Sequence, residues 1–179
     1  MIIGLLGNKN VGKDTIADFL VTEKKFIKYS FADPLKEALI ELFGLSKVQV
    51  YGNKKEEEDE FWGITPRQIM QFFGTDVMQF KLQELIPNLE RNFFVKRFEQ
   101  ILKKYPNQNI VVADVRFQHE IDSIKKNGGI IIKIKREKSS KTYLNHISES
   151  DIDNLEGIDH LINNNYTTQY AFDEVQKLL

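Results

Sequence analysis

The chain has 179 residues and a formal net charge of -1, so it is long enough for one compact domain and has no global charge that favours nucleic acid or an anionic membrane. It contains no cysteine, which excludes disulfides, thiolate nucleophiles and Cys-ligated zinc and fits a reducing compartment. No apolar run approaches the ~20 residues of a membrane span, and the apolar start is too short for a signal peptide. These features predict a cytoplasmic globular protein.

The first part of the chain, up to residue 105, alternates between apolar strands and amphipathic helices. In chain order, these predicted elements are a buried strand at 2–6, a helix at 13–24, a strand at 26–31, and helices at 33–42, 65–73, 76–85 and 93–105. Asp33 is expected to cap the second helix, with Pro34 in its first turn. Gly74 is expected to interrupt or end the helix that Thr65 opens. The charged stretch 45–63 is predicted to be a solvated loop.

The rest of the chain continues this alternation. In chain order, the predicted elements are a strand at 110–113, a helix at 118–126, a strand at 130–134, a polar irregular stretch at 135–157, a short strand at 161–162 and a helix at 168–179. Strands joined by helices favour a parallel sheet with right-handed crossovers. The chain is therefore predicted to be an α/β protein of three layers, α/β/α, with a mostly parallel sheet of about five strands.

A glycine-rich segment joins the first strand to the first helix. Its sequence, Gly7-Asn8-Lys9-Asn10-Val11-Gly12-Lys13, has the G-x-x-x-x-G-K spacing of a P-loop. Glycines let successive backbone N–H groups turn towards phosphate oxygens, and the lysine supplies a cation for the β- and γ-phosphates. The residues expected to bind the ATP phosphates are Gly7, Asn8, Asn10, Val11, Gly12, Lys13, Asp14 and Thr15.

Two acidic residues are candidates for holding Mg²⁺. Asp14 stands where a P-loop usually has Ser or Thr, and Thr15 follows it. A carboxylate beside a triphosphate is tolerable only if it helps to hold Mg²⁺ or faces away from the phosphates. Asp114 closes an apolar strand at the carboxyl edge of the predicted sheet, where ligands of such folds bind. It is expected to coordinate Mg²⁺, with a helix cap or a structural acid as the alternative.

P-loop proteins include switches, motors and small-molecule kinases. The chain is too short for motor machinery and lacks an N-K-x-D segment that reads guanine, which leaves an ATP-dependent kinase as the preferred interpretation. Such an enzyme needs an acceptor pocket, cations around the transferred group and a lid that excludes water.

Five motifs then occur in an order that resembles the deoxynucleoside monophosphate kinases of bacteriophages and related viruses. They are Gly12-Lys13-Asp14-Thr15, 31–36 (FADPLK), 67–76 (R-x-x-x-Q-x-x-G-T-D), 114–120 (DVRFQHE) and 146–149 (HISE). The resemblance covers nearly the whole chain and includes Asp after the P-loop lysine. It implies one P-loop kinase domain over 1–179, like a nucleoside monophosphate kinase, with a helical acceptor region at about 33–105 and a lid at about 136–157.

The resemblance also implies roles for individual residues. The acceptor-binding candidates are Asp33, Lys36, Arg67, Gln71, Thr75, Asp76 and Arg116. Gly74-Thr75-Asp76 is expected to form a tight turn. The alternatives are that Asp33 only caps its helix, that Lys36, Arg67 and Gln71 form a solvated helix face, and that Arg116 pairs with Glu120 on the surface.

Lys13, Arg116, Arg136 and Asp33 are the candidate catalytic residues, with Arg136 closing onto the γ-phosphate. Asn163 belongs to a segment, 162–164, that resembles the one packing the donor adenine. His119 is expected to be structural, and His146 and Glu149 to order the lid. Trp62, Phe72, Phe73 and Phe80 could stack on a base but are expected to belong to the core.

The predicted reaction transfers the γ-phosphoryl group of ATP·Mg²⁺ to a (deoxy)nucleoside monophosphate. The alternatives are a kinase for another small phosphorylated acceptor, of the dephospho-coenzyme A or phosphomevalonate type, and a nucleotide-sensing P-loop protein without turnover. The expected partners are small nucleotides, without stable nucleic acid or membrane. A homodimer is possible, and the sequence does not specify which base is accepted. If the protein is viral, the expected location is the host cytoplasm.

Overall fold

The computed structural model of the chain describes residues 1–137 and 152–179. The expectations for His146 and Glu149, and for most of the predicted lid, fall outside these residues. The fold is organised in two compact units. One comprises Met1–Ser30 with Ile101–Leu179 and contains the sheet, and the other, Phe31–Gln100, is helical.

The first unit is built on a five-stranded sheet in which every neighbouring pair of strands is parallel, in the order β2-β3-β1-β4-β5. The strands are β1 (Ile2–Leu6), β2 (Ile27–Tyr29), β3 (Ile110–Val115), β4 (Ile130–Lys135) and β5 (His160–Asn163). This arrangement confirms the predicted α/β fold class. β2 is shorter than the predicted strand at 26–31, and β3 continues through Asp114 to Val115 instead of ending before it.

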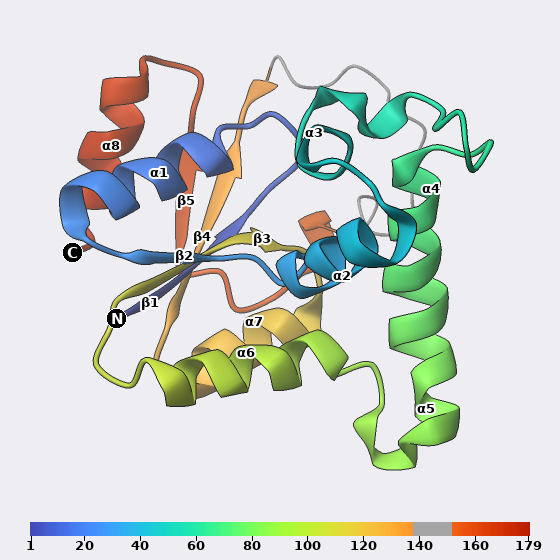
Figure 1. Cartoon of the computed structure of the whole chain (residues 1–179). Helices are drawn as coiled ribbons and strands as arrows, with labels where there is room; N and C mark the ends of the chain where they lie inside the picture. Colours follow the sequence, from blue (N-terminus) through green and yellow to red (C-terminus); the bar gives the residue numbers. More distant parts are fainter. Residues whose placement is uncertain (138–151) are drawn as a thin grey trace. The chain divides into compact units, whose positions relative to one another are not determined.

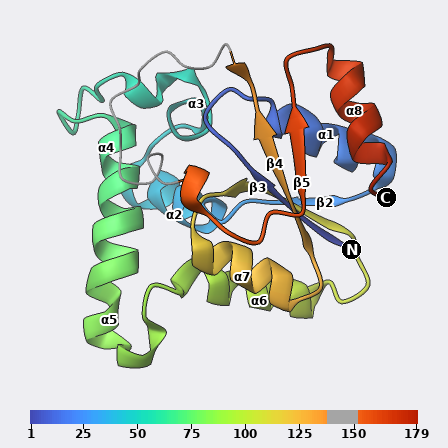
Figure 2. The same ribbon diagram turned by 180° about the vertical axis from the view of Figure 1, so that it is seen from behind.

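Helices cover both faces of this sheet (Figures 1 and 2). They are α1 (Lys13–Lys24), α7 (Gln118–Lys126) and α8 (Thr168–Gln176), and a short 3-10 helix spans Ile152–Asn154. On the face that α1 and α8 cover, Leu5, Ile132 and Leu20 belong to one buried apolar cluster. Phe19 and Phe172 stack there with their ring centroids 4.2 Å apart, so the two helices are joined by aromatic packing as well.

The helical unit begins with α2 (Asp33–Phe43) and continues through segments that the sequence did not predict. The stretch 45–63, expected to be a loop, contains α3 (Lys47–Val50) and a 3-10 helix (Asn53–Glu56). The N-cap of α2 is Ala32 and not Asp33, which lies inside the first turn. The structure therefore contradicts both the loop and the capping role of Asp33.

A long helical rod follows (Figure 1). It consists of α4 (Pro66–Gln71), a π-helix (Phe72–Lys81) and α5 (Leu82–Leu85), and a 3-10 turn (Pro87–Leu89) leads to α6 (Phe93–Lys104), whose last residues belong to the first unit. Gly74 neither interrupts nor ends the helix, and Gly74-Thr75-Asp76 is not a tight turn. A β-carbon on Gly74 would lie 3.1 Å from Leu35, so the glycine lets the wide turns pass close to α2.

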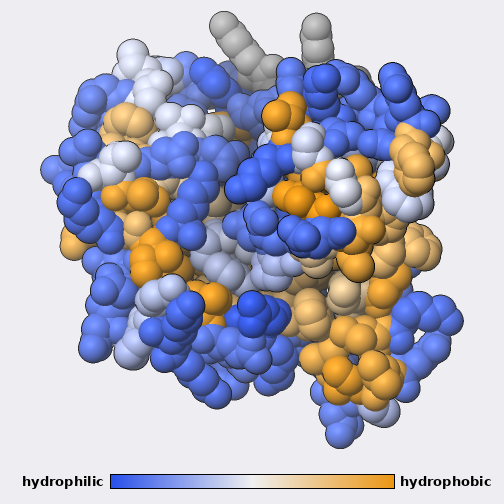
Figure 3. All heavy atoms as spheres, viewed as in Figure 1, coloured by the Kyte–Doolittle hydropathy of each residue, from blue (hydrophilic) through white to orange (hydrophobic). Residues whose placement is uncertain are grey.

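Several large apolar side chains of the helical unit are exposed. Trp62, Phe72 and Phe80 are among them, which contradicts the expectation that these rings belong to the core. Figure 3 shows apolar side chains gathered over the rod, where Leu85 and Ile86 are exposed as well. No helix within 1–137 or 152–179 has the length and apolar character that a bilayer crossing requires.

Candidate active site

The P-loop has the backbone conformation of a phosphate-binding turn. Asn10 (φ 66°) and Gly12 (φ 107°) take positive φ angles, which Asn and Gly adopt with the least steric cost. Gly7 is buried, and a β-carbon there would collide with the backbone oxygen of Ile134 on β4. The N–H of Ile16 donates to the Gly12 oxygen at 3.1 Å, which begins α1 directly from the loop. The loop thus lies between a buried strand and a helix N-terminus, as the sequence predicts.

The Lys13 side chain folds back over this loop. Its Nζ donates to the backbone oxygens of Gly7 and Asn8, at 2.7 Å each. The ammonium group therefore lies beside the same turn whose N–H groups are expected to bind phosphate. A phosphate oxygen is a stronger acceptor for an ammonium group than a neutral carbonyl, so a bound polyphosphate would compete for it.

Asp14 is held by a lysine on the neighbouring strand. Its carboxylate lies 3.3 Å from Lys28 Nζ, which also pairs with Asp18 at 2.8 Å. Burial lowers the pKa of Lys28, but the hydrogen bonds and charges of Asp18 and Asp14 outweigh it and the net shift is upward. This ion pair neutralises Asp14 without a metal ion, which favours the alternative that its carboxylate faces away from the phosphates.

Asp114 lies at the carboxyl edge of the sheet beside the P-loop. The next residue, Val115, pairs in register with Leu6, which precedes Gly7. Ser30 Oγ donates to Asp114 Oδ2 at 2.5 Å and orients the carboxylate. A carboxylate is a ligand that Mg²⁺ prefers, so Asp114 fits the predicted metal role.

Magnesium that accompanies a triphosphate takes much of its coordination from phosphate oxygens and water. Such a site does not need a dense set of acidic side chains. The parts of the chain that the structure describes contain no group of three or more His, Asp or Glu placed to hold a metal ion.

Glu120 shapes the turn that carries Arg116. Its Oε2 accepts the backbone N–H groups of Arg116 (2.7 Å) and Phe117 (3.1 Å) at the start of α7. Glu120 is only 3% exposed, and burial together with the nearby charge of Asp114 raises its pKa to about 8. The alternative for Arg116, a surface ion pair with Glu120, does not hold, because Glu120 is buried and accepts backbone N–H groups instead. His119 stacks on Phe117 at 5.4 Å, in keeping with its expected structural role.

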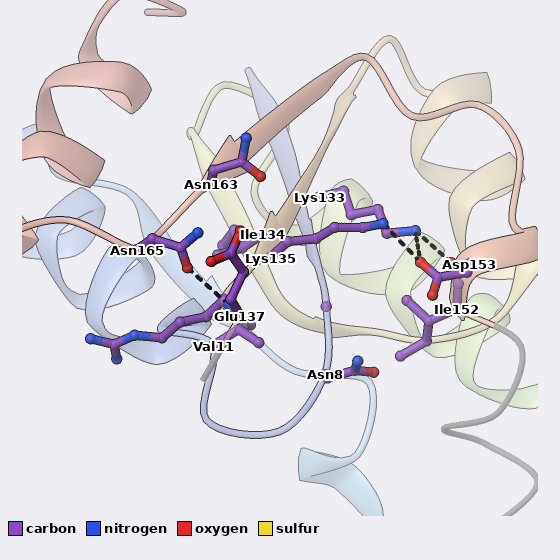
Figure 4. A pocket seen from close by; sticks show the side chains of 12 residues that line it. Asn8, Val11, Lys133, Ile134, Lys135, Glu137, Ile152, Asp153, Asn163 and Asn165 are labelled. Atoms are coloured by element: carbon purple, nitrogen blue, oxygen red, sulfur yellow. Dashed lines mark hydrogen bonds and ion pairs between the residues drawn. The ribbon is translucent and has the colours of Figure 1, made fainter. Parts of the chain in front are cut away.

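A cavity of about 310 Å³ opens beside the first residues of the P-loop (Figure 4). Gly7, Asn8 and Val11 line it from the loop, and most of the rest of the lining comes from β4, from Arg136 directly after it, from the segment that contains Asp153 and from Asn163 at the end of β5. Figure 4 shows the side chains of Lys133 and Lys135 reaching towards Asp153, whose Oδ1 lies 2.7 and 3.1 Å from their Nζ atoms. This ion pair anchors the segment after residue 151 to the sheet.

A second, smaller cavity of about 70 Å³ lies over the N-terminus of α1. Gly12 and Thr15 line it from the loop and helix, Arg136 from the end of β4, and Tyr166 and Phe172 from the region of α8. Arg136 therefore lines both cavities. The larger cavity brings P-loop residues together with Arg136 and Asn163 within the sheet unit, and the roles assigned to these residues stay predictions.

The acceptor candidates of the helical unit lie on α2, on α4 and on the π-helix that follows α4. On α4, the Arg67 guanidinium donates to Glu56 Oε1 from Nε (3.1 Å) and Nη2 (2.9 Å). Gln71 follows one turn later on the same helix. On α2, Lys36 Nζ lies 3.7 Å from Asp33 and 4.6 Å from the centroid of the Tyr51 ring. Thr75 and Asp76 belong to the π-helix, a feature that often marks functional sites.

Sequence reasoning did not find the contacts by which three residues hold the site in place: Ser30, Glu120 and Asn164. Glu120 could have been found, because a Glu in the third position of a helix typically accepts N–H groups from the preceding turn. Ser30 contacts Asp114 across 84 positions, and Asn164 contacts Val11 across 153 positions. No local pattern marks such pairs.

Comparison with solved structures supports the fold. The chain is similar to shikimate kinase from Aquifex aeolicus, with a TM-score of 0.50 and 14% identity over 99% of this chain and 95% of that one. It is equally similar to dephospho-CoA kinase from Campylobacter jejuni, with a TM-score of 0.50 and 18% identity over 99% and 96%. At these identities the likeness shows a shared fold and says nothing of the acceptor.

Sequence comparison identifies the family. The chain is 38% identical to a protein of Acanthamoeba polyphaga mimivirus, provisionally named a deoxynucleotide monophosphate kinase, over 98% of this chain and 94% of the relative. It is 25% identical to the deoxynucleotide monophosphate kinase of Enterobacteria phage T4, over 99% and 98%. The sequence profile described as "Deoxynucleotide monophosphate kinase" matches residues 1–64 and 44–174. This chain, with its P-loop and parallel sheet, therefore belongs to the deoxynucleotide monophosphate kinase family.

Proposed function

We propose that this enzyme transfers the γ-phosphoryl group of ATP to a deoxynucleoside monophosphate, giving ADP and a deoxynucleoside diphosphate. The observation that carries the proposal is a P-loop with phosphate-binding geometry in a chain that matches this family over nearly its whole length. The two kinases with a similar fold are named for other acceptors, shikimate and dephospho-CoA. The proposed acceptor is therefore inferred from the family and not from the fold.

The donor nucleotide is assigned to the first unit. Its phosphates bind the N–H groups of the P-loop and Lys13, at the positive N-terminus of α1. The adjoining small cavity, with Tyr166 in its lining, is assigned to part of the nucleoside, since about 70 Å³ is too small for base and ribose together. Asp114 would hold a bound Mg²⁺, which supplies charge neutralisation at the β- and γ-phosphate oxygens.

The candidates of the helical unit are proposed to bind the acceptor monophosphate, and Arg116, which belongs to the sheet unit, is a separate candidate for the acceptor phosphate. The Arg67 guanidinium already forms a fork onto one carboxylate oxygen of Glu56, and this arrangement suits phosphate oxygens as well. The Gln71 amide can both donate to and accept from a base edge. The residues also assigned to binding the acceptor monophosphate are Lys36, Asp33, Thr75 and Asp76.

Transfer breaks the bond between the γ-phosphorus and the bridging oxygen of ADP and forms a bond to an oxygen of the acceptor phosphate. That oxygen is already anionic, so the reaction needs neither a protein nucleophile nor a strong base. Cations supply the catalysis, because negative charge spreads over the equatorial oxygens in the transition state. The positive charges are assigned to Lys13, Arg136 and Arg116. Asp33 is assigned to orienting the acceptor.

An acceptor screen tests the proposal. With Mg·ATP, we expect ADP release with at least one of the four common deoxynucleoside monophosphates, and none with shikimate or dephospho-coenzyme A. ATP binding without turnover of any nucleoside monophosphate would contradict the proposal and favour a nucleotide sensor.

Arg67→Lys tests the acceptor site. Lysine keeps the charge but loses the planar fork, so we expect the KM for the monophosphate to rise about 10-fold while ATP affinity is unchanged. Steady-state kinetics with the acceptor varied at saturating ATP measures this. Arg97→Lys is the matched control, because Arg97 donates to Gln100 on α6 and has no assigned role. An unchanged KM in Arg67→Lys would remove Arg67 from the acceptor site.

A further inference from the structure

A buried asparagine connects the last strand to the P-loop. Asn164 follows β5 directly and is only 8% exposed. Its backbone N–H donates to the Lys135 oxygen at 2.7 Å, which extends the pairing of β5 with β4. Its side-chain Nδ2 donates to the Val11 oxygen at 2.8 Å, in a buried hydrogen bond. The backbone of Asn164 is thus fixed in the sheet while its amide reaches the second half of the P-loop.

The hydrogen bond decides which way one peptide group faces. The Val11–Gly12 peptide is trans, since the described chain contains no cis peptide bond. In a trans peptide the C=O and N–H groups point in opposite directions. Because Asn164 holds the Val11 oxygen, the Gly12 N–H is directed away from Asn164. If the peptide turned over, a carbonyl oxygen would replace that N–H and would repel a phosphate oxygen.

Gly12 and Asn164 also fit each other sterically. A β-carbon on Gly12 would collide with Asn164 Nδ2, so the amide occupies the space that a side chain at position 12 would need. The Gly12 oxygen in turn accepts the N–H of Ile16 in the first turn of α1. The orientation of this one residue therefore links the loop to the helix N-terminus, and both contribute to anion binding.

We propose that Asn164 is a positioning residue for the donor polyphosphate: its amide holds the Val11–Gly12 peptide so that the Gly12 N–H binds a phosphate oxygen. This inference deepens the donor site of the proposed function. The proposed role requires a hydrogen-bond donor at residue 164, because the group it faces, the Val11 oxygen, is an acceptor. Aspartate has nearly the same shape but would place a negative oxygen against the Val11 oxygen and close to the phosphates, so Asn164→Asp is the sharpest variant.

The test measures affinity for Mg·ATP and for tripolyphosphate by calorimetry, with the unfolding midpoint recorded alongside. We expect Asn164→Ala to raise both dissociation constants about 10-fold, because the Gly12 N–H is no longer held in its orientation. We expect Asn164→Asp to raise them about 100-fold, because the new negative charge also repels the phosphates. Tripolyphosphate has no base. An effect on ATP alone would show that Asn164 contacts the nucleoside, which it could reach through the small cavity, and would overturn the proposal.

Asn127→Asp is the matched control. Asn127 also donates from Nδ2 to a backbone oxygen, that of Ser123 at 2.8 Å, but at the end of α7. We expect this variant to lose a similar amount of stability and to keep wild-type affinity for both probes. Wild-type affinity in folded Asn164→Ala would reduce Asn164 to a structural residue, even if Asn164→Asp does not fold. Turnover of monophosphates is not part of this readout, so the inference and the proposed function can fail separately.

Discussion

Lys13→Ala is expected to lower the rate constant of phosphoryl transfer by at least about 10³-fold, because it removes a cation from the position where charge develops in the transition state. The structure places Lys13 Nζ 2.7 Å from two carbonyl oxygens of the P-loop. Only a short movement separates these acceptors from a phosphate bound in the same loop. Single-turnover measurement with ATP and the preferred monophosphate separates this effect on chemistry from an effect on binding.

Lys24→Ala is the matched control for Lys13, since Lys24 lies in the last turn of the same helix and has no role in the site. Its removal changes the net charge equally and should alter the rate less than about 2-fold, because Lys24 lies at the opposite end of α1 from the P-loop. If Lys13→Ala turned over as fast as Lys24→Ala, the transferred phosphoryl group could not be held by this loop.

Glu120→Gln is expected to remove a pH-dependent loss of stability. Burial and the charge of Asp114 raise the pKa of Glu120 from 4.5 to about 8 in the folded protein. The folded state therefore holds this proton more tightly than the unfolded state. The resulting stability is fully present below the unfolded pKa and is lost as the pH rises through the folded pKa. Between about pH 6 and about pH 9, the wild-type protein should lose roughly 3 kcal/mol from this one group.

Glutamine keeps the acceptor oxygen for the N–H groups of Arg116 and Phe117 but cannot ionise. We expect Glu120→Gln to be more stable than wild type at the higher pH and to keep its kinase activity at the lower one. Urea unfolding of both proteins at the two pH values measures the difference. Glu84→Gln is the control, because Glu84 lies on the surface in a pair with Lys81 (2.8 Å), and exposed ion pairs contribute little to stability. Equal pH slopes for wild type and Glu120→Gln would show that Glu120 is not protonated in the fold.

The placement of Asp14 shows how a local motif can leave a role open. The motif places its carboxylate at the start of α1, beside the expected phosphates, but cannot say which way it points. In the structure Lys28, on β2, pairs with Asp14 and Asp18. A strand residue and a helix residue meet in this way only when the chain has folded, so sequence alone left both alternatives standing.

The helical unit was predicted less well than the sheet unit. Its short helices between 45 and 63 carry many charges and little apolar periodicity, so composition suggested loop. The capping box of Ser46 and Gln49 was a readable local signal that was overlooked. The π-helix through Gly74 was not readable, because its wide turns depend on the packing of Gly74 against Leu35.

The sequence by itself determined the fold class, the P-loop and the family resemblance, because apolar strands, helical periodicity and the G-x-x-x-x-G-K spacing are local patterns that arise from backbone geometry and burial. Only the tertiary structure decided which side chains hold that loop and its neighbouring acid in place. Asn164 reaches Val11, and Ser30 reaches Asp114, because parallel strands bring their carboxyl ends to one edge of a sheet. Such contacts depend on strand order and register, which no segment of the chain specifies alone.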